Sequence, residues 1–314
     1  MFRRISLNFG YQRAFLSKIA LKEPKTNKIL TYFATDKGRF VSFFAIFGCG
    51  IQVALFRNAL HSQLQGYLED LNQHFTDGSP TKLSPKLKQI LDEVAIELDL
   101  SPEEIQNTKV ILANVEEPIS YGYSKYTLCQ KVLLCLPYYF NYGSSDNVDK
   151  NVILTDNAKK FGIARELQRA SMGIRRLETY FGMVLLCSTY ICSRVINTKF
   201  NLLRLKFTSR LIPYLSLVLF HFGFMWNFSN SVLRATHEHE LDDMIARISE
   251  KYAKGGVEFY AKERDRNLAS RDPTEPKINL KGNVIGSMFF QQVRTTDRMD
   301  RCEKIIALHH AGLN

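Results

Sequence analysis

The sequence has few cysteines and none of the common signatures of an enzyme. Six cysteines among 314 residues are too few for a disulfide scaffold in a chain of this length. There is no P-loop, no Gly-x-Gly-x-x-Gly, no Gly-x-Ser-x-Gly and no Cys-x-x-Cys pair, so the motifs of nucleotide binding and serine hydrolysis are missing. Internal repeats and low-complexity tracts are also missing. The length suffices for one large domain or two small ones with a buried core.

Acidic residues are outnumbered by basic ones. There are 31 Asp and Glu residues against 42 Lys and Arg residues, which gives a net charge of +11. Such an excess indicates binding to nucleic acid or to an anionic membrane surface, or the presence of a basic import signal. Apolar residues at 45% and charged residues at 23% are ordinary globular values, which excludes disordered and fibrous proteins. A mean hydropathy of −0.16 excludes a chain that is mostly membrane but permits a few spans.

Three long runs of uncharged residues interrupt the polar sequence. They cover 40–56, 179–193 and 211–233, and basic residues stand at or near their ends. A bilayer core requires about 17–25 mainly apolar residues per helix, and flanking basic and aromatic residues are typical of membrane interfaces. The alternative is three buried helices of a soluble protein. We expect a mainly α, multi-pass membrane protein with transmembrane helices over 39–57, 177–196 and 211–231.

The segment 1–38 resembles a mitochondrial presequence in its composition. Residues 1–22 include five basic side chains and no acidic one, as is typical of mitochondrial import signals. The alternative is a basic arm that lies on anionic lipid. The loop 197–210 is also basic. Because basic loops stay on the inner side, we expect the N-terminus in the matrix, with regions 58–176 and 232–314 facing the intermembrane space.

The two regions outside the expected spans show clear signals of local structure. Region 58–176 is expected to be α+β and region 232–314 to be helical. Ser84-Pro85 and Ser101-Pro102 each combine a helix cap with a proline at the first helical position, and Thr155 is expected to cap a third helix. Further helices are predicted over 58–75 and 235–252, and strands over 109–115 and 131–136.

A charged segment has the form of a zinc-peptidase motif with its metal ligands replaced. In His-Glu-x-x-His peptidases two histidines on one helical face hold zinc, and the glutamate activates water. Here Arg165 and Arg169 stand at the histidine positions around Glu166, and Glu238 and Asp242 follow downstream. This order resembles membrane metallopeptidases of the HtpX type. It predicts vestigial peptidase-like positions at these five residues.

Arginine at both histidine positions argues against metal chemistry. A guanidinium group stays protonated and has no lone pair for a metal ion. We therefore expect no enzyme activity, no catalytic residue, no metal ligand and no cofactor. The hypothesis that follows is that Arg165 or Arg169 takes the vacated cation position and pairs with Glu238. The alternative is a charged, solvated helix face.

Several segments together resemble the transmembrane protein 177 family. They are Asn157–Leu167, Glu238–Asp242 and above all Tyr252–Lys262, whose most specific residues are Gly255, Gly256, Val257, Glu258, Phe259 and Tyr260. The resemblance implies a multi-pass protein of the mitochondrial inner membrane without enzymatic activity. It also implies a role in cytochrome c oxidase assembly, in which newly synthesised subunit 2 is stabilised together with its membrane chaperone. Membrane lipid is the remaining partner that it implies.

Two roles within this function are expected for local features. The strand 131–136 would bind a client polypeptide by edge pairing. The pair Gly255-Gly256 favours a helix stop, with a contact surface as the alternative.

Two other functions are alternatives to the assembly role. An active membrane zinc endopeptidase would need histidines where this chain has arginines. A pore or transporter subunit is disfavoured because repeats and intramembrane acidic residues are missing. Nucleic acid is not expected as a partner, since the excess basic charge lies largely in the presequence-like segment and the basic loop.

Overall fold

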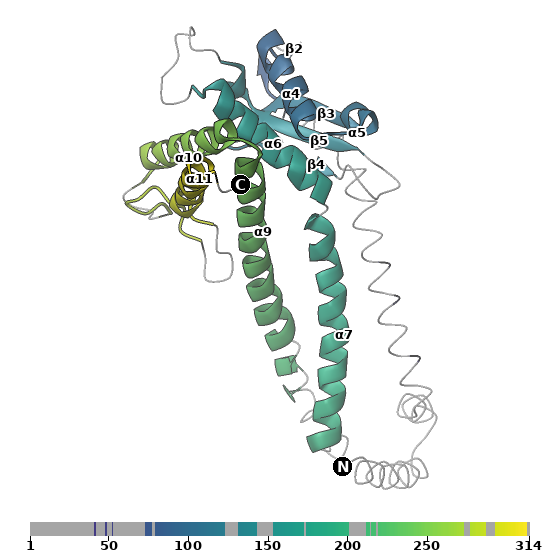
Figure 1. Ribbon diagram of the computed structural model, residues 1–314. Coiled ribbons are helices and arrows are strands. Elements are labelled where there is room, and N and C mark those ends of the chain that lie inside the picture. The colour runs from purple at the N-terminus through teal and green to yellow at the C-terminus, as the bar shows by residue number, and fades with distance from the viewer. Residues whose placement is uncertain are drawn as a thin grey trace, which may run out of the picture. The chain divides into compact units, whose positions relative to one another are not determined.

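The structure is a computed structural model of the full chain (Figure 1). It describes residues 41, 48, 52, 73–76, 79–122, 131–142, 153–172, 174–200, 212–213, 215–217, 219–272, 277–286 and 293–312. The presequence-like segment lies outside the described residues, as do nearly all of the expected first span and the helix expected over 58–75. Those predictions therefore stay predictions.

The chain divides into two compact units. The larger unit consists of Phe56–Tyr180 and Leu219–Asn314, and the smaller one of Met1–Leu55 and Phe181–Val218. Helix α7, Ile174–Phe200, begins in the larger unit and supplies most of the described residues of the smaller one. The sheet, the buried core and the candidate site all belong to the larger unit.

A three-stranded sheet forms one part of the larger unit. Its strands β3 (Thr108–Ala113), β5 (Val132–Pro137) and β4 (Ile119–Gly122) lie in the order β3-β5-β4. The central strand β5 runs parallel to β3 and antiparallel to β4, and all six of its residues are buried. A separate short ribbon pairs β1 (Phe75–Thr76) with β2 (Ser79–Pro80).

The sheet confirms both predicted strands but corrects the role given to one of them. The segment 131–136 corresponds to β5, which has a neighbour on each side and therefore no free edge for a client. The predicted edge pairing at this strand is wrong. The reason is β4, a short strand in the tyrosine- and glycine-rich segment that the sequence did not predict.

The local capping signals correctly predicted three helix starts. Helix α4, Pro85–Glu97, begins after Ser84, whose hydroxyl accepts a hydrogen bond from the Leu87 amide at 3.2 Å. Helix α5, Pro102–Gln106, carries a full capping box between Ser101 and Glu104. Thr155 precedes α6, Asp156–Met172, and accepts from the Ala158 amide at 3.4 Å. A 3₁₀ segment, η1 (Tyr138–Asn141), follows the sheet.

The C-terminal region is helical, as predicted. A π-helical segment, η3 (Leu219–Met225), leads into α9 (Trp226–Ile248), α10 (Glu250–Ala269) and α11 (Thr295–His310). Figure 1 shows α10 and α11 packed together near the upper end of α9. The main core lies among these helices, α4, α6 and the sheet, and includes Phe140, Phe161 and Phe259.

Helix α10 passes through Gly255-Gly256 without a break, so the expected helix stop is wrong and the contact surface is correct. A Cβ atom on Gly255 would overlap the backbone of Asn157 at the start of α6. A Cβ on Gly256 would lie 2.8 Å from both Phe161 and Cys302. Glycine is therefore required because α6 and α11 approach α10 closely here.

Replacing Gly255 with Ala should lower the free energy of unfolding by about 1–3 kcal/mol. The overlap is with backbone atoms, so it outweighs the gain of about 1 kcal/mol that alanine brings to a helix interior. Chemical denaturation measures the change. Gly223→Ala is the matched control because its added Cβ would meet no atom within 4 Å beyond its chain neighbours and its own helix backbone. Equal stabilities of the two variants would contradict the packing argument.

The fold class expected from the apolar runs is wrong. Among the residues that the structure describes, no helix is both long enough and apolar enough to cross a membrane. Helix α7 contains the second run, but Arg175, Arg176 and Glu178 lie in its first turns. The part of the third run from Leu219 onward is divided between η3 and α9, and α9 continues into strongly charged sequence. The observed fold is mixed helical with a small sheet, not a three-span bundle.

Candidate functional site

Three helices of the larger unit bring three arginines and three carboxylates together in a buried cluster. Helix α6 contributes Arg165, Glu166 and Arg169, α9 contributes Glu238 and Asp242, and α11 contributes Arg298. Three positive and three negative charges balance. We call these six residues the ion-pair cluster.

Arg165 lies at the centre of the ion-pair cluster and is only 2% exposed. Its Nε donates to Asp242 Oδ1 at 3.1 Å, and its Nη1 donates to Glu166 Oε1 at 3.1 Å. Its Nη2 donates to Glu238 Oε2. One guanidinium group thus contacts all three carboxylates. The predicted pairing of Arg165 with Glu238 is confirmed, and a solvated helix face is excluded.

Arg169 makes a second bridge between α6 and α9. Its Nη2 donates to Glu238 Oε1 at 2.6 Å, and its Nη1 lies 2.9 Å from Glu166 Oε1. Because residues four apart share one face of a helix, both arginines reach the same carboxylate. Glu238 is therefore held between two guanidinium groups.

Arg298 is the member of the ion-pair cluster that the sequence analysis missed. It binds Asp242 through two atoms, with Nε to Oδ2 at 2.6 Å and Nη2 to Oδ1 at 2.9 Å. Its guanidinium lies 4.4 Å from the ring centre of Tyr260, whose hydroxyl donates to Asp242 at 2.6 Å. No local pattern marks Arg298, since its contact with Asp242 spans 56 residues of sequence.

Glu166 connects the ion-pair cluster to the sheet. It has no exposed surface, and its Oε2 accepts from the Ser120 amide at 3.0 Å and from the Ser120 hydroxyl at 3.1 Å. Its other oxygen faces the two arginines of α6. Both oxygens of the carboxylate at the water-activating position are therefore occupied by donors from the chain.

Electrostatics keeps the ion-pair cluster charged. Burial by itself would raise the pKa of Glu238, but Arg165, Arg169 and Arg298 outweigh burial and lower that pKa to about 2. Burial likewise opposes ionisation of Asp242, yet Arg298 and Arg165 hold its pKa below the usual range. The neighbouring carboxylates keep the pKa of Arg165 above its ordinary value despite burial. Near neutral pH these groups form ion pairs.

The six-residue motif Gly255–Tyr260 supports the helices around the ion-pair cluster. Gly255 and Gly256 allow the close helix contacts, and Phe259 belongs to the core. Val257 packs against the core, and Tyr260 bonds to Asp242. Glu258 accepts from the Thr155 amide at 3.0 Å and so supports the start of α6. The motif therefore holds together the helices that carry the ion-pair cluster.

The fold and the ion-pair cluster define a mixed helical protein in which buried charges connect helices to a small sheet. The chain is similar to Transmembrane protein 177 of Rattus norvegicus, at 26% identity over 272 residues that cover 78% of this chain and 83% of the relative. Transmembrane protein 177 of Mus musculus is 25% identical over the same coverage. These matches confirm the predicted resemblance to the transmembrane protein 177 family.

The names of both relatives describe transmembrane proteins, and they indicate that this chain is a membrane protein. No family model and no solved structure matches the chain. The likeness of the ion-pair cluster to a vestigial peptidase site therefore stays a prediction.

Proposed function

We propose that the chain is a non-enzymatic assembly factor of the mitochondrial inner membrane. In this proposal it binds newly synthesised cytochrome c oxidase subunit 2, together with the chaperone of that subunit, and stabilises it before assembly. The regions 58–176 and 232–314 would face the intermembrane space. The location and the client are the ones that the family resemblance implies.

The occupied carboxylates of the ion-pair cluster are the observation that best supports a binding role. Peptide hydrolysis by a zinc enzyme needs three protein ligands with lone pairs and a site for water. At the two positions in α6 this chain has guanidinium groups, which have none. Glu166 is bonded to Ser120 and to arginines and has no oxygen available for a water molecule. A protein whose helices are held together by these ion pairs can bind a polypeptide on a fixed surface without hydrolysing it.

Affinity purification of the tagged protein from gently solubilised mitochondria tests this proposal. The mitochondrial translation products are radiolabelled just before solubilisation, and the same tag on an unrelated inner-membrane protein is the control. We expect labelled subunit 2 to be enriched over the other labelled products. An eluate without this enrichment would contradict the assigned client. Stoichiometric zinc in the purified protein, or peptide hydrolysis that a chelator stops, would instead support the endopeptidase.

A further inference from the structure

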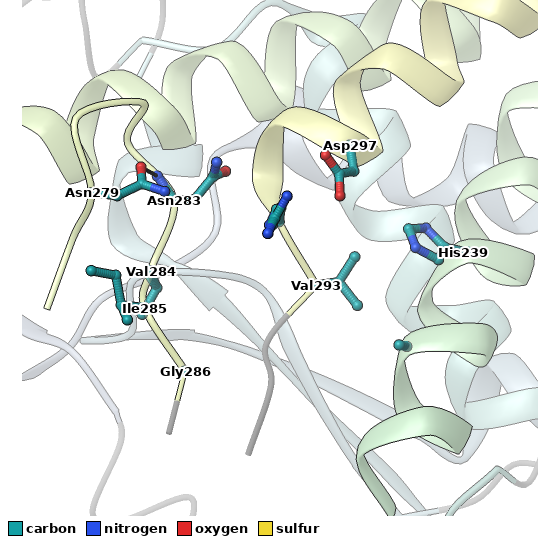
Figure 2. A pocket seen from close by; sticks show the side chains of 10 residues that line it. His239, Asn279, Asn283, Val284, Ile285, Gly286, Val293 and Asp297 are labelled. Carbon is teal, nitrogen blue, oxygen red and sulfur yellow. Dashed lines mark hydrogen bonds between the residues drawn. The ribbon is translucent and has the colours of Figure 1, made fainter. Parts of the chain in front are cut away.

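A polar pocket of about 420 Å³ lies outside the ion-pair cluster, between α9 and the start of α11. This volume falls in the range of roughly 300–1,000 Å³ that is typical of ligand sites. In Figure 2 the loop that carries Asn279 and Asn283 forms one side of the pocket, and His239 of α9 forms the other. All of its lining residues belong to the larger unit.

The loop side of the pocket is held in place by its own hydrogen bonds. Asn279 Oδ1 accepts from the amides of Lys281 at 2.9 Å and Asn283 at 3.0 Å. Asn283 is 2% exposed and bonds through its side chain to the Thr296 amide and hydroxyl, both at 3.1 Å. The side-chain amides of Asn279 and Asn283 form hydrogen bonds within the chain, so they shape the pocket. Other side chains would have to bind a ligand.

Charge at the pocket is available for a partner. Arg294 is exposed, and its side chain makes no capping bond to α11. Within the described part of the chain, neither Arg294 nor the exposed Lys281 forms an ion pair. Asp297 is the acidic residue of the lining. Burial and the nearby Arg301 lower the pKa of His239, so this imidazole is neutral near pH 7. The lining thus carries one cation and one carboxylate, and Lys281, on the same loop but outside the lining, adds a second cation.

Aliphatic side chains of the loop are exposed too, and two of them, Val284 and Ile285, line the pocket together with Arg294. Leu280 is 78% exposed, Ile285 is 52% exposed and Val284 is 37% exposed. They lie on the same short loop, where an antiparallel bridge joins Ile278 to Val284. Exposed apolar side chains next to unpaired positive charge fit a partner with the complementary pattern, an acidic residue flanked by aliphatic ones.

We propose that this pocket and its aliphatic rim bind an acidic, aliphatic segment of a polypeptide, with a carboxylate on Arg294. The inference rests on the proposed function, because it says which chemistry of a client the chain would recognise. The carboxylate accepts from the guanidinium group, and the aliphatic neighbours of the acidic residue cover Leu280 and Ile285. A single carboxylate suits the site better than a phosphate dianion, since Asp297 would repel the second charge.

Fluorescence anisotropy with the full-length protein tests the proposal. The probe is a labelled seven-residue peptide with one glutamate between two valines, and the matched peptide has glutamine in place of glutamate. We expect the glutamate peptide to bind about tenfold more tightly, and Arg294→Gln to remove about that factor. Leu280→Ser should weaken both peptides. Arg247→Gln, which removes an exposed arginine of α9 away from the pocket, should change neither.

Three results would overturn the proposal. They are equal binding of the two peptides, unchanged binding to the Arg294→Gln variant, and an Arg294-dependent affinity for vesicles of acidic phospholipid without affinity for the peptide. Recovery of labelled subunit 2 separates this inference from the proposed function. If the Arg294→Gln variant lost the peptide but still retrieved the subunit as well as wild type, the pocket would not be the client site while the assembly role would survive.

Discussion

Replacing Arg165 with Met should lower the free energy of unfolding by about 3–5 kcal/mol. The substitution keeps most of the side-chain volume but removes the charge that contacts Glu166, Glu238 and Asp242. Two of these carboxylates have no exposed surface. Leaving buried carboxylates without their common partner costs far more than losing an exposed ion pair, which contributes at most about 1 kcal/mol. Chemical denaturation of the purified variant measures the change.

Arg301→Met is the matched control for this prediction. Arg301 bonds Asp243 at 3.0 Å and also connects α11 to α9, but its side chain is 40% exposed. We expect its loss to cost less than about 1 kcal/mol. If Arg165→Met cost no more than this control, the ion-pair cluster would contribute little to stability.

A double substitution separates two contributions to the loss of stability in Arg165→Met: the lost attraction between Arg165 and Glu238, and the cost of burying Glu238 without its partner. Adding Glu238→Leu to Arg165→Met removes one of the carboxylates left without its partner. The double variant should then be more stable than the sum of the two single changes predicts, because contacting residues are not additive. An additive result would show that Arg165 and Glu238 act independently in spite of their contact.

Features of the fold that depend on adjacent residues could be predicted from the sequence. Ser84, Ser101 and Thr155 mark helix starts because a capping side chain bonds an amide two or three residues away. The shared face of Arg165 and Arg169 follows from helical spacing alone. Such local patterns predicted which side chains of α6 would reach α9.

Features that depend on distant residues could not be predicted in this way. The position of β5 in the centre of the sheet depends on pairing with β4, and the role of Arg298 depends on α11 folding back against α9. Gly255 could be assigned only after α6 was seen to approach α10, since a glycine at a helix stop and a glycine at a close contact have the same sequence signal. Among the described residues, the second and third apolar runs failed as spans because hydropathy does not show where a helix ends.

The ion-pair cluster connects segments that the sequence separates. The charges join α6 to α9 and α11, and Ser120 adds the sheet to the same assembly. The pocket near Arg294 lies at the start of α11, one turn before Arg298. The ion-pair cluster therefore fixes the helix whose first residues form a wall of the pocket, which places the proposed binding surface on a rigid support.

Replacing Glu263 with Gln should stabilise the protein at alkaline pH and leave it nearly unchanged at acidic pH. Glu263 lies on α10 and is 6% exposed. Its Oε1 accepts from the Thr295 hydroxyl at 2.9 Å, and its Oε2 is buried without a hydrogen-bond partner among the described residues. Burial, and then repulsion from Glu117, raise the pKa of Glu263 to about 8, although Arg298 and Arg165 act in the opposite direction.

The sign of the pH dependence follows from proton binding. Between pH 4.5 and about 8 the folded protein keeps the proton on Glu263 while the unfolded chain releases it. The folded state binds more protons, so stability falls as the pH rises through this window and levels off above it. At about 1.4 kcal/mol per pKa unit, the upper bound on the loss is about 4–5 kcal/mol. Glutamine keeps an acceptor for Thr295 and has no proton to lose, so the variant avoids this loss.

Urea unfolding at pH 5 and pH 8.5 measures the difference between wild type and Glu263→Gln. Glu303→Gln, an exposed change on α11, controls for the removal of a carboxylate as such and should follow the wild-type pH dependence. If the variant were no more stable than wild type at pH 8.5, the claim that Glu263 is protonated in the folded protein would be wrong. A gain that grows from pH 5 to pH 8.5 would mean that α10 and α11 are joined by a carboxyl that stays protonated in the folded protein up to about pH 8. One interface would then combine permanently charged groups with a group that must stay neutral.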